Sequence, residues 1–451
     1  MKKIKIKPIV ITSCFSILFV ANSFGQEDIT KYRRSSLSMI LIESPSLGKS
    51  RDLVVNAYKS NPFPDKYNKH NSGAGAFNLN EMELTTEDYL ASGFYQDTLR
   101  KFTEILKAAA NPLRELRYLA ADSSAAIQEP SAKQMRQIYL DKYIRDNNLA
   151  KSMAGTWFNR TEDGSMNWEL VKERGMYSAS AEDKDQASSA ANPEDMLMDF
   201  ELLGNTYSVF NEMEFYENEP VARIVRDEAK MALAEQGLTG ILYEKAAAKI
   251  DTLYERTKVG YTVKCNSFLY KLDWDENTAN NVKNYFFNDN IDGKAAWDTT
   301  TIFNLSFVGK ITSGSIVTFK IGETRTEEEI IDLQIRRTMD NALAKLQKKY
   351  VQFRPVSPIS SVGPLTARIG MKEGLEGGEK FEILEMGWND LGIPEWKSVG
   401  KVSLDKKAQV WDNRQGAEVV LAEDGSPLPE FTTFKGGKKA MPGMHYIRLV
   451  K

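Results

Sequence analysis

Apolar residues recur with helical spacing in one long segment that begins near residue 326. Its first residue, Thr326, precedes Glu329 by three positions, which is the spacing of a capping box. Acidic residues at its start, and Lys348 and Lys349 at its end, suit the helix dipole. We therefore predict an amphipathic helix over 326–350. Its apolar face comprises Ile331, Ile335, Met339, Leu343, Leu346 and Tyr350.

Residues 26–220 mix strand and helix periods. Apolar runs of strand length alternate with segments of helical spacing, and stretches rich in turn-forming residues separate them. We therefore predict an α/β domain over this range. Its predicted elements are a strand at 36–43, a helix from Leu47 to Tyr58, a loop at 61–73, a helix from Glu87 to Ala110, an exposed connection at 178–195, and, within 196–216, a helix capped by Gly204 and then a strand.

The region 221–353 combines a helix pair with strands. Helical spacing runs through Val221–Gln236 and Gly240–Lys258, and Gly237 separates the two helices. Three runs rich in aromatic and β-branched residues follow, and Thr312–Gly314 is predicted to be a hairpin turn between the last two. We predict an antiparallel sheet here, accompanied by the 326–350 helix. The three runs are YTVKCNSFLYKLDW (261–274), TIFNLSFVGKI (301–311) and SIVTFKIG (315–322).

The prolines of 353–364 cannot continue the long helix, so we place a domain boundary there. The remaining residues contain short β-like runs separated by glycine, aspartate and proline, and a closed barrel protects the edges of strands this short. The sequence thus predicts an α+β, multidomain chain that ends in a small all-β, barrel-like domain over 354–451. The runs are TARIGM, EKFEILEM, KVSLD and AQVWDN.

The N-terminus has the pattern of a secretory signal. Four lysines precede an apolar stretch over 8–21, and the small residues Ser23 and Gly25 suit signal peptidase, so we predict cleavage before Gln26. Export to the periplasm, the outer-membrane periphery or the extracellular space follows. Alternatively, 11–14 resembles a lipoprotein signal that lipidates Cys14, although apolar sequence continues after that cysteine. No later segment approaches the roughly 20 apolar residues of a membrane span, so we predict none in the mature chain.

Composition narrows the class of partner. Hydrophobic residues make up 42% and charged residues 27% of the 451, which is typical of a folded globular protein. Loss of residues 1–25 removes four lysines and no acids, so the formal net charge of −3 becomes −7. A nucleic-acid partner requires a basic face, and we predict none. Cys265 is then the remaining cysteine; its apolar surroundings predict a buried, inert thiol rather than a reactive one.

Candidate ligand residues do not complete a known motif. His70 lies in a polar loop and His445 in the predicted last strand; His70 could act as a base or ligand, but we predict structural roles for both. Two acidic stretches begin like calcium-binding loops. The stretch at 273–284 lacks the glycine and the closing glutamate, and the stretch at 288–299 lacks the closing acid. We predict solvated turns, with neither a metal nor a cofactor.

The glycine-rich segments do not complete a nucleotide-binding motif either. Gly73 and Gly75 are followed by Asn78 where a dinucleotide fingerprint needs its third glycine. Residues 48–50 end like a phosphate-binding loop, but Glu43 stands where the first glycine of that loop belongs.

Acidic and aromatic candidates have simpler structural interpretations. The run Glu327–Glu329 suits a helix start better than a catalytic site. Trp157 and Phe158, with Trp168, could form a sugar-stacking platform, but we predict core packing. We assign no catalytic, cofactor-binding or metal-binding residue.

Four segments together resemble a family of exported, largely uncharacterised bacterial envelope proteins. They are PFPDKYNKH (62–70), WFNRTEDGSMNWELVKERGMYSAS (157–180), FLYKLDW (268–274), and GLEGGEKFEILE with VWDNR at 410–414. In addition, LLGNTYSV (202–209) and IGMKEGLEGGEKFEIL (369–384) are similar to patterns in the flagellar assembly T protein and the curli-secretion lipoprotein. This resemblance implies α/β modules and a small C-terminal barrel that build or brace outer-membrane machinery, and it carries no catalytic residues.

We therefore expect a non-enzymatic envelope protein that contacts other envelope proteins, with a homo-oligomer among the possible assemblies. The alternative is an exported hydrolase that acts on glycans or peptides through carboxylates assembled by the fold. A glycan-binding protein is a third hypothesis, and exposed aromatic platforms would distinguish it.

Overall fold

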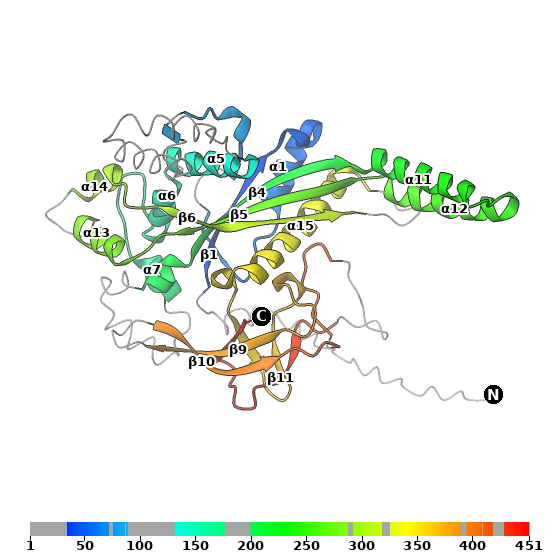
Figure 1. Ribbon diagram of the computed structural model, residues 1–451. Coiled ribbons are helices and arrows are strands. Elements are labelled where there is room, and N and C mark those ends of the chain that lie inside the picture. Colours follow the sequence, from blue (N-terminus) through cyan, green and yellow to red (C-terminus); the bar gives the residue numbers. More distant parts are fainter. Residues whose placement is uncertain are drawn as a thin grey trace, which may run out of the picture. The chain divides into compact units, whose positions relative to one another are not determined.

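In the computed structural model, a six-stranded mixed sheet joins segments from β1 to β6 (Figure 1). The central order is β2-β1-β4-β5-β6, and β3 also pairs with β1. Strand β1 is parallel to β2, β3 and β4, whereas β4, β5 and β6 are antiparallel neighbours. The strands are β1 (Ser36–Glu43), β2 (Asn68–Lys69), β3 (Ala76–Asn78), β4 (Thr206–Glu217), β5 (Tyr261–Leu272) and β6 (Leu305–Ile316).

The structure describes most of the chain, and all of the described residues belong to one unit, Tyr32–Lys451. The predicted signal at 1–25, nearly all of the predicted helix at 87–110 and the predicted connection at 178–195 lie outside the described residues. The described ranges are 34–71, 75–85, 87–88, 131–175, 199–286, 292–317, 325–388, 394–407, 409–417 and 428–450.

Helices α1 (Arg51–Ser60) and α15 (Glu327–Lys349) cover one face of the sheet. The helix predicted from Thr326 is confirmed: the Thr326 hydroxyl accepts from the Glu329 amide, and the Glu329 carboxylate accepts from the Thr326 amide. Because side chains alternate along a strand, Met213 and Phe215 of β4 meet this face. The short helices η2 (Pro45–Ser50) and η4 (Val351–Phe353) flank it.

Helices α5 (Ala132–Asp146) and α6 (Leu149–Trp157) contribute to the core on the other face. Phe210, Phe268 and Tyr270 of the sheet pack there against Leu140 and Met153. A second, aromatic-rich cluster adjoins α6 and includes residues of four further helices. Those helices are α7 (Glu169–Gly175), α10 (Phe200–Gly204), α13 (Glu276–Phe286) and α14 (Gly293–Thr299). The short helix η3 (Leu79–Glu81) contributes Leu79 to the first cluster, which contains Phe210.

Between β4 and β5 the chain forms a helical hairpin, α11 (Asn218–Glu235) and α12 (Gly240–Thr257). Figure 1 shows the two helices side by side beyond the ends of β4 and β5. The predicted helix pair is confirmed, and Gly237 adopts the positive φ of 72° that the turn between the helices requires. Of the helices in the described part of the chain, none has both the length and the apolar character needed to cross a bilayer.

The C-terminal region closes into a six-stranded barrel of order β10-β11-β8-β7-β12-β9, which confirms the predicted α+β class with a small barrel. Its core contains Phe381, Ile383, Phe434 and Ile447. The elements are β7 (Ser357–Ser361), β8 (Leu365–Ala367), η5 (Met371–Glu373), β9 (Lys380–Trp388), β10 (Pro394–Ser403), β11 (Thr432–Gly436) and β12 (His445–Leu449).

Buried and half-buried polar groups attach the barrel to α15. The Arg354 guanidinium donates to the carbonyls of Gln347 and Lys348 at the end of α15 and to that of Leu449 in β12. Asp340 of α15 accepts from the amide of Gly416 at 3.0 Å, and Arg337 donates to the carbonyl of the same residue at 3.1 Å.

The structure corrects several local predictions. Thr312–Gly314 is not a hairpin turn, because β6 pairs with β5 without interruption there and Thr312 lies opposite Asn266. A Cβ at Gly314 would lie 2.6 Å from the Val263 carbonyl oxygen, so this glycine serves close strand pairing rather than a turn. Gly204 is the last residue of α10, and Asn205 is the cap.

Part of the proline-rich segment at 353–364 is strand β7, in which Pro358 pairs with Tyr446. One run near the barrel differs from expectation. The run AQVWDN at 408–413 forms no strand in its described residues; instead the Trp411 backbone bonds to the Thr432 hydroxyl and the Met371 amide. The main sheet also continues across position 220, where the sequence placed a boundary, because β4 pairs with β5.

Candidate functional site

The α11–α12 hairpin has almost no core of its own. Asn218 is the single buried residue of α11, and α12 has none. Helices in globular proteins are stabilised mainly by burying an apolar face, and isolated helices of this length are marginal in water. Two 18-residue helices that together bury a single residue therefore leave an apolar surface available to another element.

Several polar contacts join α11 to α12. Lys230 forms an ion pair with Asp251 at 2.6 Å, and the Tyr254 hydroxyl donates to Glu219 at 3.0 Å. The Arg226 guanidinium lies 4.5 Å from the centroid of the Tyr254 ring. These contacts join the helices to each other.

Most of the large apolar side chains of the hairpin are exposed. Of the eighteen exposed large apolar residues among the described residues, ten lie on the hairpin or at its base, so the exposure is concentrated rather than scattered. A groove of about 450 Å³ runs along this surface between the two helices and ends at Ile316 of β6. We call these ten residues the apolar hairpin surface: Tyr216, Val221, Ile224, Val225, Met231, Ile241, Leu242, Leu253, Val259 and Ile316.

The charges around this surface balance. The segment 218–258 carries seven acids and seven bases, which are Glu219, Asp227, Glu228, Glu235, Glu244, Asp251, Glu255, and Arg223, Arg226, Lys230, Lys245, Lys249, Arg256, Lys258. Helices that bind anionic membranes or nucleic acid carry an excess of bases. The balance here instead suits a partner whose surface also mixes both signs.

The two helices are predicted from the sequence, but this surface is not. The available signal was that apolar residues occupy more than one face of each helix: in α11, Ala222, Ala229 and Leu233 are half-buried, while Val221 and Val225 are exposed. A helix that is apolar on two faces packs against two partners, and the described residues provide only one of them.

His70 lies in the core rather than in an accessible site. Its Nε2 is 2.8 Å from the Met153 carbonyl oxygen, and its Nδ1 is 2.9 Å from Nη1 of Arg174. Burial, together with the Arg174 charge, lowers the pKa of His70 to about 3. The neutral ring therefore donates from Nε2 and accepts at Nδ1, which is a structural role.

Cys265 and His445 are also buried. Cys265 is fully buried in β5, and burial raises the pKa of its thiol to about 12, which leaves it protonated and inert. His445 is buried in β12, where its Nδ1 accepts from the Met441 amide at 2.8 Å. The structure does not bring the two histidines or the thiol together.

The acidic candidates cap helices or accept hydrogen bonds. Asp275 accepts from the Thr278 amide at the start of α13, and Asp292 accepts from the Ala295 amide at the start of α14. Glu327 accepts from the hydroxyls of Ser50 and Tyr261 at 2.7 and 2.9 Å. The described residues contain no group of three or more histidine, cysteine, aspartate or glutamate side chains placed to hold a metal. Asn288, Asn290 and Gly73 lie outside the described residues.

The aromatic candidates belong to the core. Trp157 and Phe158 are fully buried, and Trp168 packs edge-on against Phe158 with ring centroids 5.4 Å apart. These rings join Trp274 and Trp297 in one cluster, so they do not form an exposed sugar-stacking platform.

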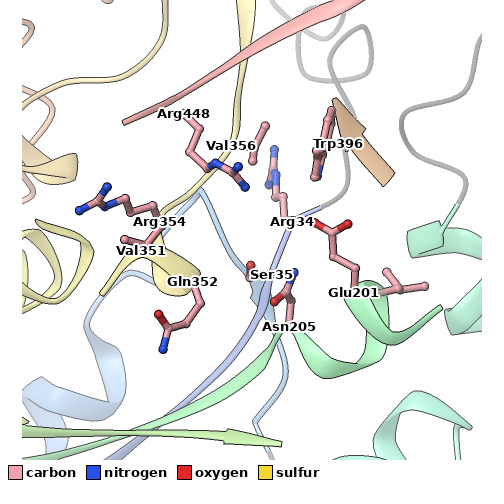
Figure 2. Close-up of a pocket in the computed structure, with 11 residues that line it drawn as sticks. Arg34, Ser35, Glu201, Asn205, Val351, Gln352, Arg354, Val356, Trp396 and Arg448 are labelled. Carbon is pink, nitrogen blue, oxygen red and sulfur yellow. The ribbon is translucent and has the colours of Figure 1, made fainter. Parts of the chain in front are cut away.

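A cavity of about 390 Å³ next to the barrel is lined by three arginines, Trp396 and Glu201. Figure 2 shows the guanidinium groups of Arg34 and Arg448 turned toward each other, whereas that of Arg354 points away. Arg448 pairs with Glu382 at 2.8 Å, and Arg354 binds the carbonyls at the end of α15. The contacts of Arg354 and Arg448 therefore hold the barrel together and attach it to α15.

A second cavity, of about 570 Å³, contains two carboxylates, Asp340 and Asp412. Burial raises the pKa of Asp340, whereas Arg414 lowers the pKa of Asp412. Opposite shifts of this kind occur in acid–base pairs. Here both groups hold one loop: Asp340 binds the Gly416 amide, and Asp412 accepts two hydrogen bonds from the Arg414 guanidinium.

No family model and no curated protein matches the chain.

Proposed function

We propose that the protein is an exported, non-enzymatic assembly component of the cell envelope that contacts other proteins through the apolar hairpin surface. The observation that carries this proposal is the exposure of ten large apolar side chains on and beside two helices that bury almost nothing. Large exposed apolar patches usually mark interaction sites, because leaving them in water is costly. The proposed partner surface is helical, apolar along its centre, and lined by charges of both signs.

The rival hydrolase hypothesis has less support. Its best candidates, Asp340 and Asp412, are already engaged by the loop that they hold on α15. Their shifts in pKa follow from burial and from Arg414, so loop attachment accounts for them without a substrate. The glycan-binding hypothesis also has less support, because its aromatic candidates pack in the core and do not form an exposed platform.

Site-specific photo-crosslinking in cells that make the full chain tests this proposal. A photoreactive phenylalanine in place of Leu253 is expected to give discrete protein adducts. The same residue in place of Val399 of β10 is expected to give few, although the two native side chains are similarly exposed, at 56% and 50%. The adducts from position 253 should disappear when Val225→Glu is added, because a charge in the groove opposes apolar contact.

Equal adduct yields at positions 253 and 399, or adducts at 253 that survive Val225→Glu, would contradict the proposal. The adduct mass separates partners: a mass twice that of the chain identifies a second copy, and any other discrete mass identifies a different protein.

A further inference from the structure

We infer that the partner of the apolar hairpin surface is a second copy of this chain, and that two hairpins pack into a four-helix bundle. This inference rests on the proposed function and names its partner. A pair of helices cannot enclose an apolar centre, whereas four can, and bundles of this kind form readily from antiparallel helical hairpins. The two hairpins would lie antiparallel to each other, related by a two-fold axis.

The spacing of residues along the two helices supports this arrangement. On α11, Val221, Val225 and Ala232 follow one another at intervals of four and seven residues, and on α12, Leu242, Ala246 and Leu253 repeat the same intervals. Antiparallel hairpins place α11 of one copy parallel to α12 of the other. Under the two-fold axis these two parallel helices lie diagonally across the bundle, so equal spacing brings the three apolar positions of one helix level with those of the other in the same layers of the bundle centre.

One charged residue interrupts each row of apolar positions at the same point. Glu228 lies three residues after Val225, and Lys249 lies three residues after Ala246. Both side chains are exposed, and neither takes part in an ion pair with any described residue of its own chain. In the bundle Glu228 of one copy is level with Lys249 of the second copy, and the two-fold axis forms this pair twice. The surface is therefore complementary to itself in charge as well as in apolar pattern.

The area available is sufficient for a specific dimer. Eighteen residues at about 1.5 Å each give helices about 27 Å long, and two helices side by side are about 20 Å wide. The facing surfaces thus cover roughly 500 Å² per copy and roughly 1,000 Å² in total, near the lower limit for a specific interface. The exposed apolar residues at the turn and at the base of the hairpin also suit this antiparallel arrangement. An antiparallel pair brings Ile241 and Leu242 at the turn of one hairpin to Tyr216 and Ile316 at the base of the other.

Sedimentation velocity of the purified full chain at micromolar concentration tests the inference. The wild-type chain is expected to sediment as a dimer. Glu228→Lys and Lys249→Glu should each weaken the dimer by about tenfold, because each replaces two attractions by two repulsions. An equimolar mixture of the two variants should regain the wild-type affinity, since only the mixed pair restores both opposite-charge contacts.

Two controls complete the design. Val225→Glu with Leu253→Glu should weaken the dimer by at least about 100-fold, whereas Arg223→Glu, on the opposite side of α11, should leave it unchanged. All of these positions are exposed, so circular dichroism should show an unaltered fold.

A monomeric wild-type chain, a dimer that ignores the hairpin variants, or a mixture that remains as dissociated as its components would each overturn the second-copy inference. The proposed function fails separately, by the absence of hairpin-dependent crosslinks in cells. Hairpin-dependent adducts of another mass, together with a monomeric purified chain, would leave the proposed function standing and overturn the inference.

Discussion

Replacing Trp157 with alanine is expected to lower the free energy of unfolding by about 3–5 kcal/mol. The indole is fully buried, and its Nε1–H donates to the Thr206 hydroxyl at 2.9 Å. The Arg174 guanidinium lies 4.8 Å from its centroid, so the ring also covers a buried cation. Alanine leaves a cavity in the aromatic cluster and removes both contacts. Urea unfolding followed by circular dichroism measures the loss.

Trp168→Ala is the comparison for this prediction, because Trp168 packs on the same cluster but is only partly buried. Its truncation opens less of a cavity and should cost less than half as much. Equal losses for the two variants, or a loss below about 1 kcal/mol for Trp157→Ala, would contradict the assignment of Trp157 to the centre of this core.

Acidification is expected to destabilise the wild-type chain more than a His70→Gln variant. In the unfolded chain the pKa of a histidine is near 6.5, and in the folded chain the pKa of His70 is about 3. Between these values the unfolded state binds the extra proton, so stability is full above pH 6.5 and falls as the pH is lowered toward 3. From pH 7 to pH 4.5 this amounts to about 2–3 kcal/mol.

Glutamine retains an amide donor and acceptor at this position but does not titrate. The difference between the two pH profiles therefore isolates His70 from other groups, including Asp340 and Glu373, whose raised pKa values act in the opposite direction. Urea unfolding at several pH values supplies both profiles. Parallel profiles over pH 4.5–7 would show that His70 is not buried in its neutral form.

Local patterns predicted the elements of this fold better than their pairing. The capping box at Thr326, the helix pair split at Gly237 and the short strands of the barrel each depend on neighbouring residues, and each could be predicted. The parallel pairing of β1 with β4 joins residues about 170 positions apart, which no local pattern reveals. Gly314 was misinterpreted because glycine serves both turns and close strand pairing.

The apolar hairpin surface could not be predicted from the sequence for a related reason. Periodicity shows that a face is apolar, but it does not show what covers that face. Val221 and Val225 look like core residues in the sequence, and their exposure follows from where β4 and β5 end rather than from the helices themselves. His70 and Trp157 are predicted to have structural roles, and both side chains are fully buried. The loop and turn signals around them do not show which elements pack over them.

Thiol labelling of two single substitutions tests most directly whether the apolar hairpin surface is a contact surface. Val225→Cys lies on the hairpin and Val399→Cys on the barrel, and the native valines are almost equally exposed, at 52% and 50%. In intact cells that make the full chain, labelling is expected to be slow at position 225 and fast at position 399, with equal rates after denaturation. Equal rates at the two positions in intact cells would contradict this expectation.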